Sequence, residues 1–241
     1  MQTKRMIVAL GCAFALVGAA MAALAQAPAT GTAPTMEERI TAIKASLAQS
    51  AQNVKQYEWI ETTVLSLKGE EKSNTQKRCY YGADGTLEKV DVAPPAEDKG
   101  KPGLRGKVIA NKKEEMADYM GSAVALLKTY IPPDPAKIEA AKKAGTISTT
   151  PLAGGKTMKV DVKDYEKPGD DLSFVIDMTS NKIIGIGVAS YLTDATDAVT
   201  LDVTMGALDD GTGYPSTITL NGVSKQIKVD VSNAGYKKLA K

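Results

Sequence analysis

The last third of the chain alternates between apolar and polar side chains with a period of two. Such alternation is typical of β-strands that bury one face and expose the other. Turn signals such as Lys167-Pro168-Gly169-Asp170 and Asn221-Gly222 separate the alternating segments, and no helix-length segment intervenes, so we expect antiparallel neighbours. The predicted inward positions are Met158, Val160 and Val162; Leu172, Phe174, Ile176 and Met178; Ile184, Ile186 and Val188; Val199, Leu201, Val203 and Met205; Ile218 and Leu220; and Val223, Ile227, Val229 and Val231.

Strand-forming residues also fill three earlier segments: 57–67, 75–81 and 86–92. Gly82-Ala83-Asp84-Gly85 supplies a turn between the second and the third, since glycine tolerates positive φ. Together with the later segments this predicts about nine strands. A sheet of that width curls or closes.

Helical spacing of apolar residues marks the segment from Met36 and the segment Asn111–Ile131. Asp134 and Pro135 then predict an N-cap and first position of a short helix, which Gly145 ends. The apolar stripes are Ile40, Ile43, Leu47, Ala51 and Val54 in the first helix, and Met116, Met120, Ala123, Val124, Leu127 and Ile131 in the second.

The wide one-sided sheet needs a cover, and these amphipathic helices supply it. We therefore predict one α+β domain, in which a strongly curved antiparallel sheet, an unclosed barrel of about nine strands, wraps around a helical lid or plug. The segment 94–106 is rich in proline, glycine and charge, and is the predicted hinge or lid loop.

Residues 1–25 have the features of a secretory signal peptide. Lys4 and Arg5 precede an apolar run over 6–24, which ends in Ala23-Leu24-Ala25. We predict cleavage after Ala25, a flexible spacer over 26–35 and a single domain over 36–241. The protein would then be periplasmic or secreted, with no transmembrane anchor. The rival interpretation is an uncleaved membrane anchor, because the run approaches a spanning length.

Charge and composition exclude several function classes. The chain has 30 Lys and Arg, 28 Asp and Glu, and no histidine. Because two of the basic residues, Lys4 and Arg5, lie in the predicted signal, the remaining chain is neutral and offers no basic field for nucleic acid. Without histidine, Ser-His-Asp, Cys-His and histidine-ligated metal sites are excluded.

Motif searches indicate no cofactor. Gly106-Lys107 lacks the remaining residues of a phosphate loop, and Gly185-Ile186-Gly187 lies inside an alternating strand. Two turns are flanked by acidic residues: Asp164, Glu166, Asp170 and Asp171 at one, and those at 209–210 at the other. These carboxylates suggest a calcium site. The alternative is that they are ordinary solvated turn carboxylates. Cys79 follows two cations; it is either a reactive thiol or a half-buried strand residue.

Methionines recur on the predicted apolar faces. Flexible thioethers suit a surface that adapts to varied apolar ligands; filling gaps in a core and binding copper are the alternatives. Arg78 lies on a predicted strand, where it is either a polar handle at a cavity mouth or an exposed arginine. The predicted cavity-lining residues are Met116, Met120, Met158, Phe174, Met178, Met205 and Arg78.

The order of elements resembles the LolA-like superfamily of periplasmic lipoprotein carriers. That order is an export signal, a helix, several strands, a helix pair and a long run of strands. The resemblance implies an unclosed barrel with a helical lid over an apolar cavity. Arg78-Cys79-Tyr80-Tyr81-Gly82-Ala83-Asp84-Gly85 and Pro132-Pro133-Asp134-Pro135 also resemble segments of uncharacterised secreted bacterial proteins.

Three functional hypotheses follow. The first is a non-enzymatic periplasmic carrier of an apolar ligand, a lipid or a lipoprotein acyl chain, without metal or cofactor. The second is a structural or protein-interaction module with a filled core. The third is a carboxylate-based hydrolase, which needs two acids facing each other in a cleft. A calculated internal volume separates the first two.

Overall fold

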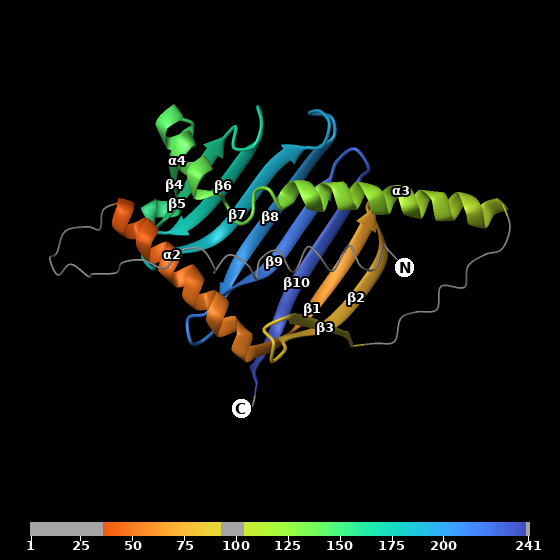
Figure 1. Cartoon of the computed structure of the whole chain (residues 1–241), viewed down its shortest axis with the longest axis horizontal. Helices are drawn as coiled ribbons and strands as arrows, with labels where there is room; N and C mark the ends of the chain where they lie inside the picture. Colours follow the sequence, from red (N-terminus) through yellow and green to blue (C-terminus); the bar gives the residue numbers. More distant parts are fainter. Residues whose placement is uncertain (1–35, 93–103, 240–241) are drawn as a thin grey trace.

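The computed structural model describes residues 36–92 and 104–239, which form helices packed on one sheet (Figure 1). The predicted signal, the spacer and most of the predicted lid loop lie outside these ranges. The helices are α2 (Met36–Asn53), α3 (Leu104–Leu127) and α4 (Pro135–Ala144). The strands are β1 (Tyr57–Leu67), β2 (Glu70–Tyr81), β3 (Leu87–Asp91), β4 (Ile147–Leu152), β5 (Thr157–Lys163), β6 (Asp171–Asp177), β7 (Lys182–Tyr191), β8 (Ala198–Ala207), β9 (Gly213–Gly222) and β10 (Ile227–Lys238).

The strands form one antiparallel sheet in the order β3-β2-β1-β10-β9-β8-β7-β6-β5-β4. Adjacent strands are consecutive in the sequence except for β1 and β10, which pair as the third and fourth strands from the β3 edge. Strands β3 and β4 are the two edges of this ten-stranded sheet, which is not closed. The predicted α+β class and the curved, unclosed antiparallel sheet are confirmed.

Strand β4 is the element that the sequence pattern missed. Residues 148–151 are exposed and do not alternate. Pro151 pairs with Met158 of β5, which is compatible with proline because only one side of an edge strand needs backbone donors. The segment 147–152 is therefore held by its neighbour rather than by its own hydrophobic pattern.

The turn predicted at Asn221-Gly222 lies at residues 223–226 instead. Strand β9 continues through Gly222, and the Gln226 backbone N–H donates to the Val223 carbonyl at 3.1 Å across the turn. A Cβ on Gly222 would approach the Tyr119 ring to 2.4 Å, so this glycine serves close packing against α3. Val223, predicted to face inward, is 54% exposed in the turn.

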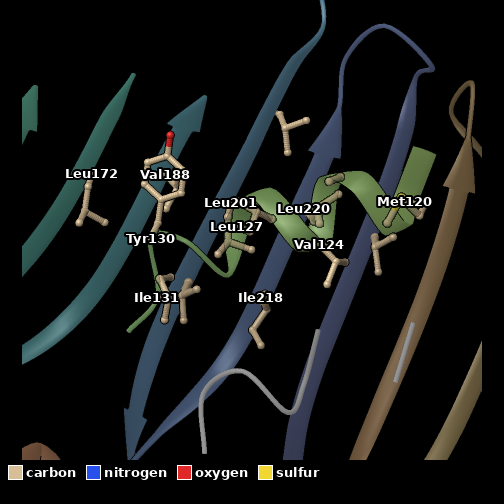
Figure 2. Close-up of a cluster of buried hydrophobic side chains, with 14 of the residues drawn as sticks. Met120, Val124, Leu127, Tyr130, Ile131, Leu172, Val188, Leu201, Ile218 and Leu220 are labelled. Atoms are coloured by element: carbon tan, nitrogen blue, oxygen red, sulfur yellow. The ribbon is translucent and has the colours of Figure 1, made fainter. Parts of the chain in front are cut away.

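Helix α3 lies across the concave face of the sheet (Figures 1 and 2). It begins earlier than predicted, with residues 104–106 of the expected lid loop in its first turn, and ends at Leu127 rather than Ile131. Pro132 and Pro133 follow, and proline disfavours helix in the residue before it. The predicted inner face is confirmed. Its buried members are Met120, Ala123, Val124, Leu127 and Ile131, with Met116 packed beside them.

Helix α4 has the predicted ends. The Asp134 Oδ1 atom accepts a hydrogen bond from the Ala136 backbone N–H at 2.8 Å, and Gly145 adopts φ 72° at the C-cap. These contacts satisfy backbone groups that the helix leaves unpaired. None of the helices in the described part of the chain has the length and hydropathy that a membrane span requires.

Asp170 links the segment between α3 and α4 to the sheet through hydrogen bonds. This carboxylate, predicted as either a calcium ligand or a solvated turn residue, is buried. It accepts hydrogen bonds from the backbone N–H groups of Tyr165 at 2.6 Å and Lys167 at 2.9 Å, and from the Tyr130 hydroxyl. Ser190 Oγ lies 2.8 Å from the Tyr130 hydroxyl. A buried carboxylate of this kind is stabilised by several donors.

Candidate functional site

A cavity of about 120 Å³ lies between α2 and the concave face of the sheet. We call it the α2 pocket. Among the described residues, its lining comes from α2 and the turn that follows it, the segment after α3 and eight strands of the sheet. These residues are Leu47, Ser50, Ala51, Val54, Trp59, Glu61, Tyr81, Leu87, Ile131, Pro133, Phe174, Ile183, Ile186, Met205, Gly213, Tyr214, Pro215, Asn233 and Tyr236.

The roof of the α2 pocket is the C-terminal half of α2, which crosses the sheet on the same side as α3 (Figure 1). Leu47, Ala51 and the following Val54 face the cavity, as their helical stripe predicts. The same stripe places Ile43 in the core, but Ile40 is 43% exposed and so departs from the prediction.

Polar contacts fix α2 over the sheet. The Ser50 hydroxyl accepts a hydrogen bond from the Gly213 backbone N–H at 2.9 Å. The Arg39 guanidinium donates to the Met178 carbonyl at 2.9 Å and to Asn181 Oδ1 at 2.6 Å. Both ends of the helix are therefore tied to turns and strand ends of the sheet.

One end of the pocket is apolar. Phe174, Ile186 and Met205 contribute there as their strand alternation predicts, and Ile131 approaches from the segment after α3. Ile183 also lines the pocket, whereas the simple alternation placed Ile184 inward. The register of β6 and β7 shifts so that Ile176 pairs with Ile183 while Val175 pairs with Gly185. This irregularity turns Ile183 to the concave face.

The other end is aromatic. The rings of Trp59 and Tyr236 stack with centroids 5.4 Å apart and an interplanar angle of 13°. Tyr214 lies 4.3 Å from Tyr236, and Tyr81 lies 6.1 Å from Trp59, measured between ring centroids. Burial raises the pKa of Tyr236, so its hydroxyl stays protonated across the physiological range.

Two backbone features set the positions of the Tyr236 and Tyr214 rings. The register of β1 and β10 shifts between Glu58 and Ile60, and Gly235 takes φ 66° at that point. This bulge brings Tyr236 to the same face as Trp59. A Cβ on Gly206 would come within 2.8 Å of the Tyr214 ring, so glycine at this position leaves room for the ring.

A buried ion pair lies beside the aromatic end. Glu61 Oε2 is 2.5 Å from Lys89 Nζ, and the two side chains are 6% and 4% exposed. Glu61 lines the pocket, while Lys89 reaches Glu61 from β3. Asn233 accepts from Trp59 Nε1 at 3.1 Å and donates to the Pro215 carbonyl at 2.9 Å. The indole ring is thereby held in one orientation.

The seven residues predicted to line a cavity separate into different environments. Phe174 and Met205 line the α2 pocket together. Met120 and Met116 instead lie in the core between α3 and the sheet. Met158 is half-buried on β5, and Met178 follows the end of β6, where its carbonyl accepts from Arg39.

Arg78 does not line the pocket. It pairs with Ile60 in the register of β1 and β2, whereas Trp59 pairs with Cys79. Directly paired residues share a face, so Arg78 lies on the convex side, 51% exposed and 3.6 Å from Glu58 Oε2. Cys79, expected to be half-buried, is completely buried on the concave side.

Within residues 36–92 and 104–239, no three His, Cys, Asp or Glu side chains gather as metal ligands would. Glu61 is the sole carboxylate among the described residues that line the α2 pocket. The arrangement therefore offers an apolar space with flat aromatic walls and one hydrogen-bonding carboxylate, which suits binding.

Comparisons with known proteins find likeness to solved structures only. No protein-family model and no curated protein matches this chain. A DUF1329 family protein from Desulfovibrio piger aligns with a TM-score of 0.37 and 6% identity, over 83% of this chain and 92% of that one. A LolA superfamily protein from Nitrosomonas europaea aligns with a TM-score of 0.35 and 7% identity, over 83% of this chain and 94% of that one. The second of these structures carries the name of the superfamily that the order of elements resembles.

Proposed function

We propose that this protein is an exported binding or carrier protein, which holds an apolar ligand in the α2 pocket. The observation that carries the proposal is the cavity of about 120 Å³ beneath one helix. An engineered apolar cavity of about 150 Å³ binds benzene. The α2 pocket therefore has the size for a ring or for the end of an apolar chain.

The walls support an apolar ligand. Leu47, Phe174, Ile186 and Met205 present hydrocarbon or thioether surface to the cavity, and burying such surface favours binding by about 25 cal/mol per Å². Met205 can repack around ligands of different shape because its side chain is unbranched.

A longer ligand, such as an acyl chain, requires α2 to move. The links that hold this helix include the hydrogen bonds of Ser50 and Arg39, which are only partly buried. Partly solvated hydrogen bonds each stabilise a contact by about 1 kcal/mol. We propose that α2 shifts to admit the chain and that the predicted signal peptide delivers the protein to the periplasm.

The geometry of the α2 pocket is also evidence against the two rival hypotheses. A structural module with a filled core would leave no space at this position. The volume of the cavity is instead larger than a few water molecules would need. A carboxylate-based hydrolase needs a second acid facing Glu61, and its partner at 2.5 Å is Lys89. Ligand binding is therefore the function that the pocket supports best.

Trp59 offers a direct test, since it is the single tryptophan of the chain and lines the pocket. Purified, delipidated protein is titrated with cis-parinaric acid, a fluorescent fatty acid, and energy transfer from Trp59 is recorded. We expect saturable transfer that unlabelled dodecanoic acid reverses. Absence of transfer and of displacement contradicts the proposal.

Two variants on the same helix separate the pocket from the surface. Ala51 lines the pocket, whereas Ala45 is exposed. Ala51→Phe fills the cavity and is expected to weaken parinarate binding by about tenfold or more, because each tenfold corresponds to about 1.4 kcal/mol. Ala45→Phe adds the same side chain outside the pocket and is expected to bind like the unaltered protein. Equal binding by both variants places the ligand elsewhere.

A further inference from the structure

The buried carboxylate of Glu61 is unusual for the wall of an apolar pocket. A charged group is seldom buried unless it is paired, and Glu61 is paired with Lys89 at 2.5 Å. Glu61 lines the cavity and Lys89 is not among the described lining residues, so the acidic partner of the pair is the one that borders it. The pocket therefore presents a hydrogen-bond acceptor to its occupant.

The shape of the same end favours a flat occupant. The parallel rings of Trp59 and Tyr236 and the adjacent ring of Tyr214 border the cavity. Their faces offer planar surfaces, on which a ring packs by offset stacking or edge contact. The hydrogen bond from Trp59 Nε1 to Asn233 prevents the indole from rotating to fit a different shape.

The charge of the ion pair selects among ring compounds. Glu61 and Lys89 neutralise each other, so a ligand cation would bring an unpaired positive charge into a desolvated space. An anionic group inside the pocket would face the Glu61 carboxylate directly. Both arrangements carry the desolvation cost of an uncompensated charge. A fatty acid such as parinarate avoids that cost when its hydrocarbon end enters the pocket and its carboxylate stays in solvent. A neutral hydroxyl donates to the carboxylate without that cost, through a charge-assisted hydrogen bond.

We infer that the α2 pocket selects an uncharged, ring-bearing apolar molecule with a hydroxyl group that donates a hydrogen bond to Glu61. The inference deepens the proposed binding function and rests on it. It assigns the apolar part of the ligand to the end with Phe174 and Met205, and the hydroxyl-bearing ring to the end with Trp59 and Tyr236.

Isothermal titration calorimetry with four matched probes tests this assignment. They are 4-ethylphenol, its methyl ether 4-ethylanisole, 4-ethylbenzoate and 4-ethylbenzylammonium, at pH 7. We expect 4-ethylphenol to bind at least about tenfold more tightly than the ether, because a hydrogen bond to a charged group is among the stronger ones. The two ions are expected to bind more weakly still. Tightest binding by the ammonium, or equal binding by phenol and ether, overturns the inference.

A double variant assigns the preference to Glu61. Glu61→Met with Lys89→Met removes the acceptor and leaves neither charge unpaired, which buried pairs commonly tolerate. The ratio of the two dissociation constants, ether to phenol, is expected to fall to about one, the value for a site without a charged acceptor. The control is Glu70→Met with Lys72→Met, an exposed pair at 2.5 Å, which should keep the full preference. Retention of the preference without Glu61 contradicts the inference.

The parinarate titration distinguishes this inference from the function on which it rests. Binding of parinarate without discrimination among the four ring probes overturns the hydroxyl selection and leaves the carrier function supported. Failure of parinarate and all four ring probes to bind overturns both.

Discussion

The two ends of the concave face meet different helices, and among the described residues the α2 pocket lies under one of them. Under α3, Leu201, Ile218 and Leu220 pack against Val124 and Leu127 in one continuous cluster (Figure 2). We call this region the packed half. Under α2, the same central strands present Met205, Pro215 and Asn233 to the α2 pocket. We call this region the pocket half.

The covering helices explain the difference. In α3, Ala123 and Leu127 are 0% and 3% exposed, so side chains of the helix and of the sheet fill the space between them. In α2, Leu47 and Ala51 are only half-buried, and polar contacts from Arg39 and Ser50 help to hold the helix. Strand alternation therefore decides which face is apolar, while the helix that covers it decides whether the space is filled.

The largest expected effect concerns the ion pair of the pocket half. Lys89→Met leaves Glu61 buried without its partner, and breaking a buried pair costs about 3–5 kcal/mol. We expect the free energy of unfolding, measured with urea, to fall by that amount. The double variant with Glu61→Met should recover most of the loss, since the charge left behind is removed as well.

A small effect of Lys89→Met would mean that Glu61 reaches water through the pocket. The pocket half would then be more open to solvent than the 6% exposure of the Glu61 side chain suggests. An equally large loss in the single and double variants would assign the cost to packing rather than to charge.

A matched pair of leucines compares the two halves directly. Leu127→Ala removes a fully packed side chain and is expected to cost about 3 kcal/mol, within the range for buried leucines. Leu47→Ala removes a side chain that already borders a cavity, so fewer contacts are lost and we expect about 1 kcal/mol. Urea unfolding of both variants gives the two values.

Equal costs for the two leucines would break the comparison, because they would show that α2 packs as tightly as α3. Ala45→Phe on the exposed side of α2 serves as the control for changes on that helix, and should leave the free energy of unfolding within about 0.5 kcal/mol.

Much of the fold follows from the hydrophobic pattern. The limits of β1 agree with the segment predicted for it, and the caps of α4 are those that Asp134 and Gly145 indicate. The inner face of α3 and the inward sets of β6 and β8 also agree with their spacing. These features depend on residues close together in the sequence, where periodicity and capping act.

The residues that line the pocket depend partly on features that regular alternation of apolar and polar positions does not contain. Two register shifts turn Ile183 and Tyr236 inward, and each arises from pairing with a neighbouring strand. Met116 and Met120 belong to the core because they lie on α3, whereas Met205 lines the pocket from a strand end that α2 covers. Glu61 did carry a signal, because it is a charge between the inward positions Trp59 and Thr63 of an alternating strand.

The smallest expected effect concerns a surface link at the pocket half. Asp210, in the turn before β9, accepts a hydrogen bond from the Tyr57 hydroxyl at 2.7 Å. Hydrogen bonds from Thr212 and Tyr57 lower the pKa of Asp210 to about 2. Because the folded-state pKa is below the unfolded value, ionised Asp210 stabilises the fold above about pH 4, and this contribution is lost as the pH falls toward 2.

Asp210→Asn therefore should lower the urea midpoint at pH 7, with the difference from the unaltered protein shrinking between pH 4 and pH 2. Tyr57→Phe, which removes one of the donors, should reproduce part of that pH dependence. Leu127 makes hydrocarbon contacts in the packed half, so Leu127→Ala should show the same deficit at every pH in this window. A difference for Asp210→Asn that stays constant down to pH 2 would mean that the link is equally strong with a protonated carboxyl. The link from Tyr57 to Asp210 would then add no acid sensitivity to the pocket half.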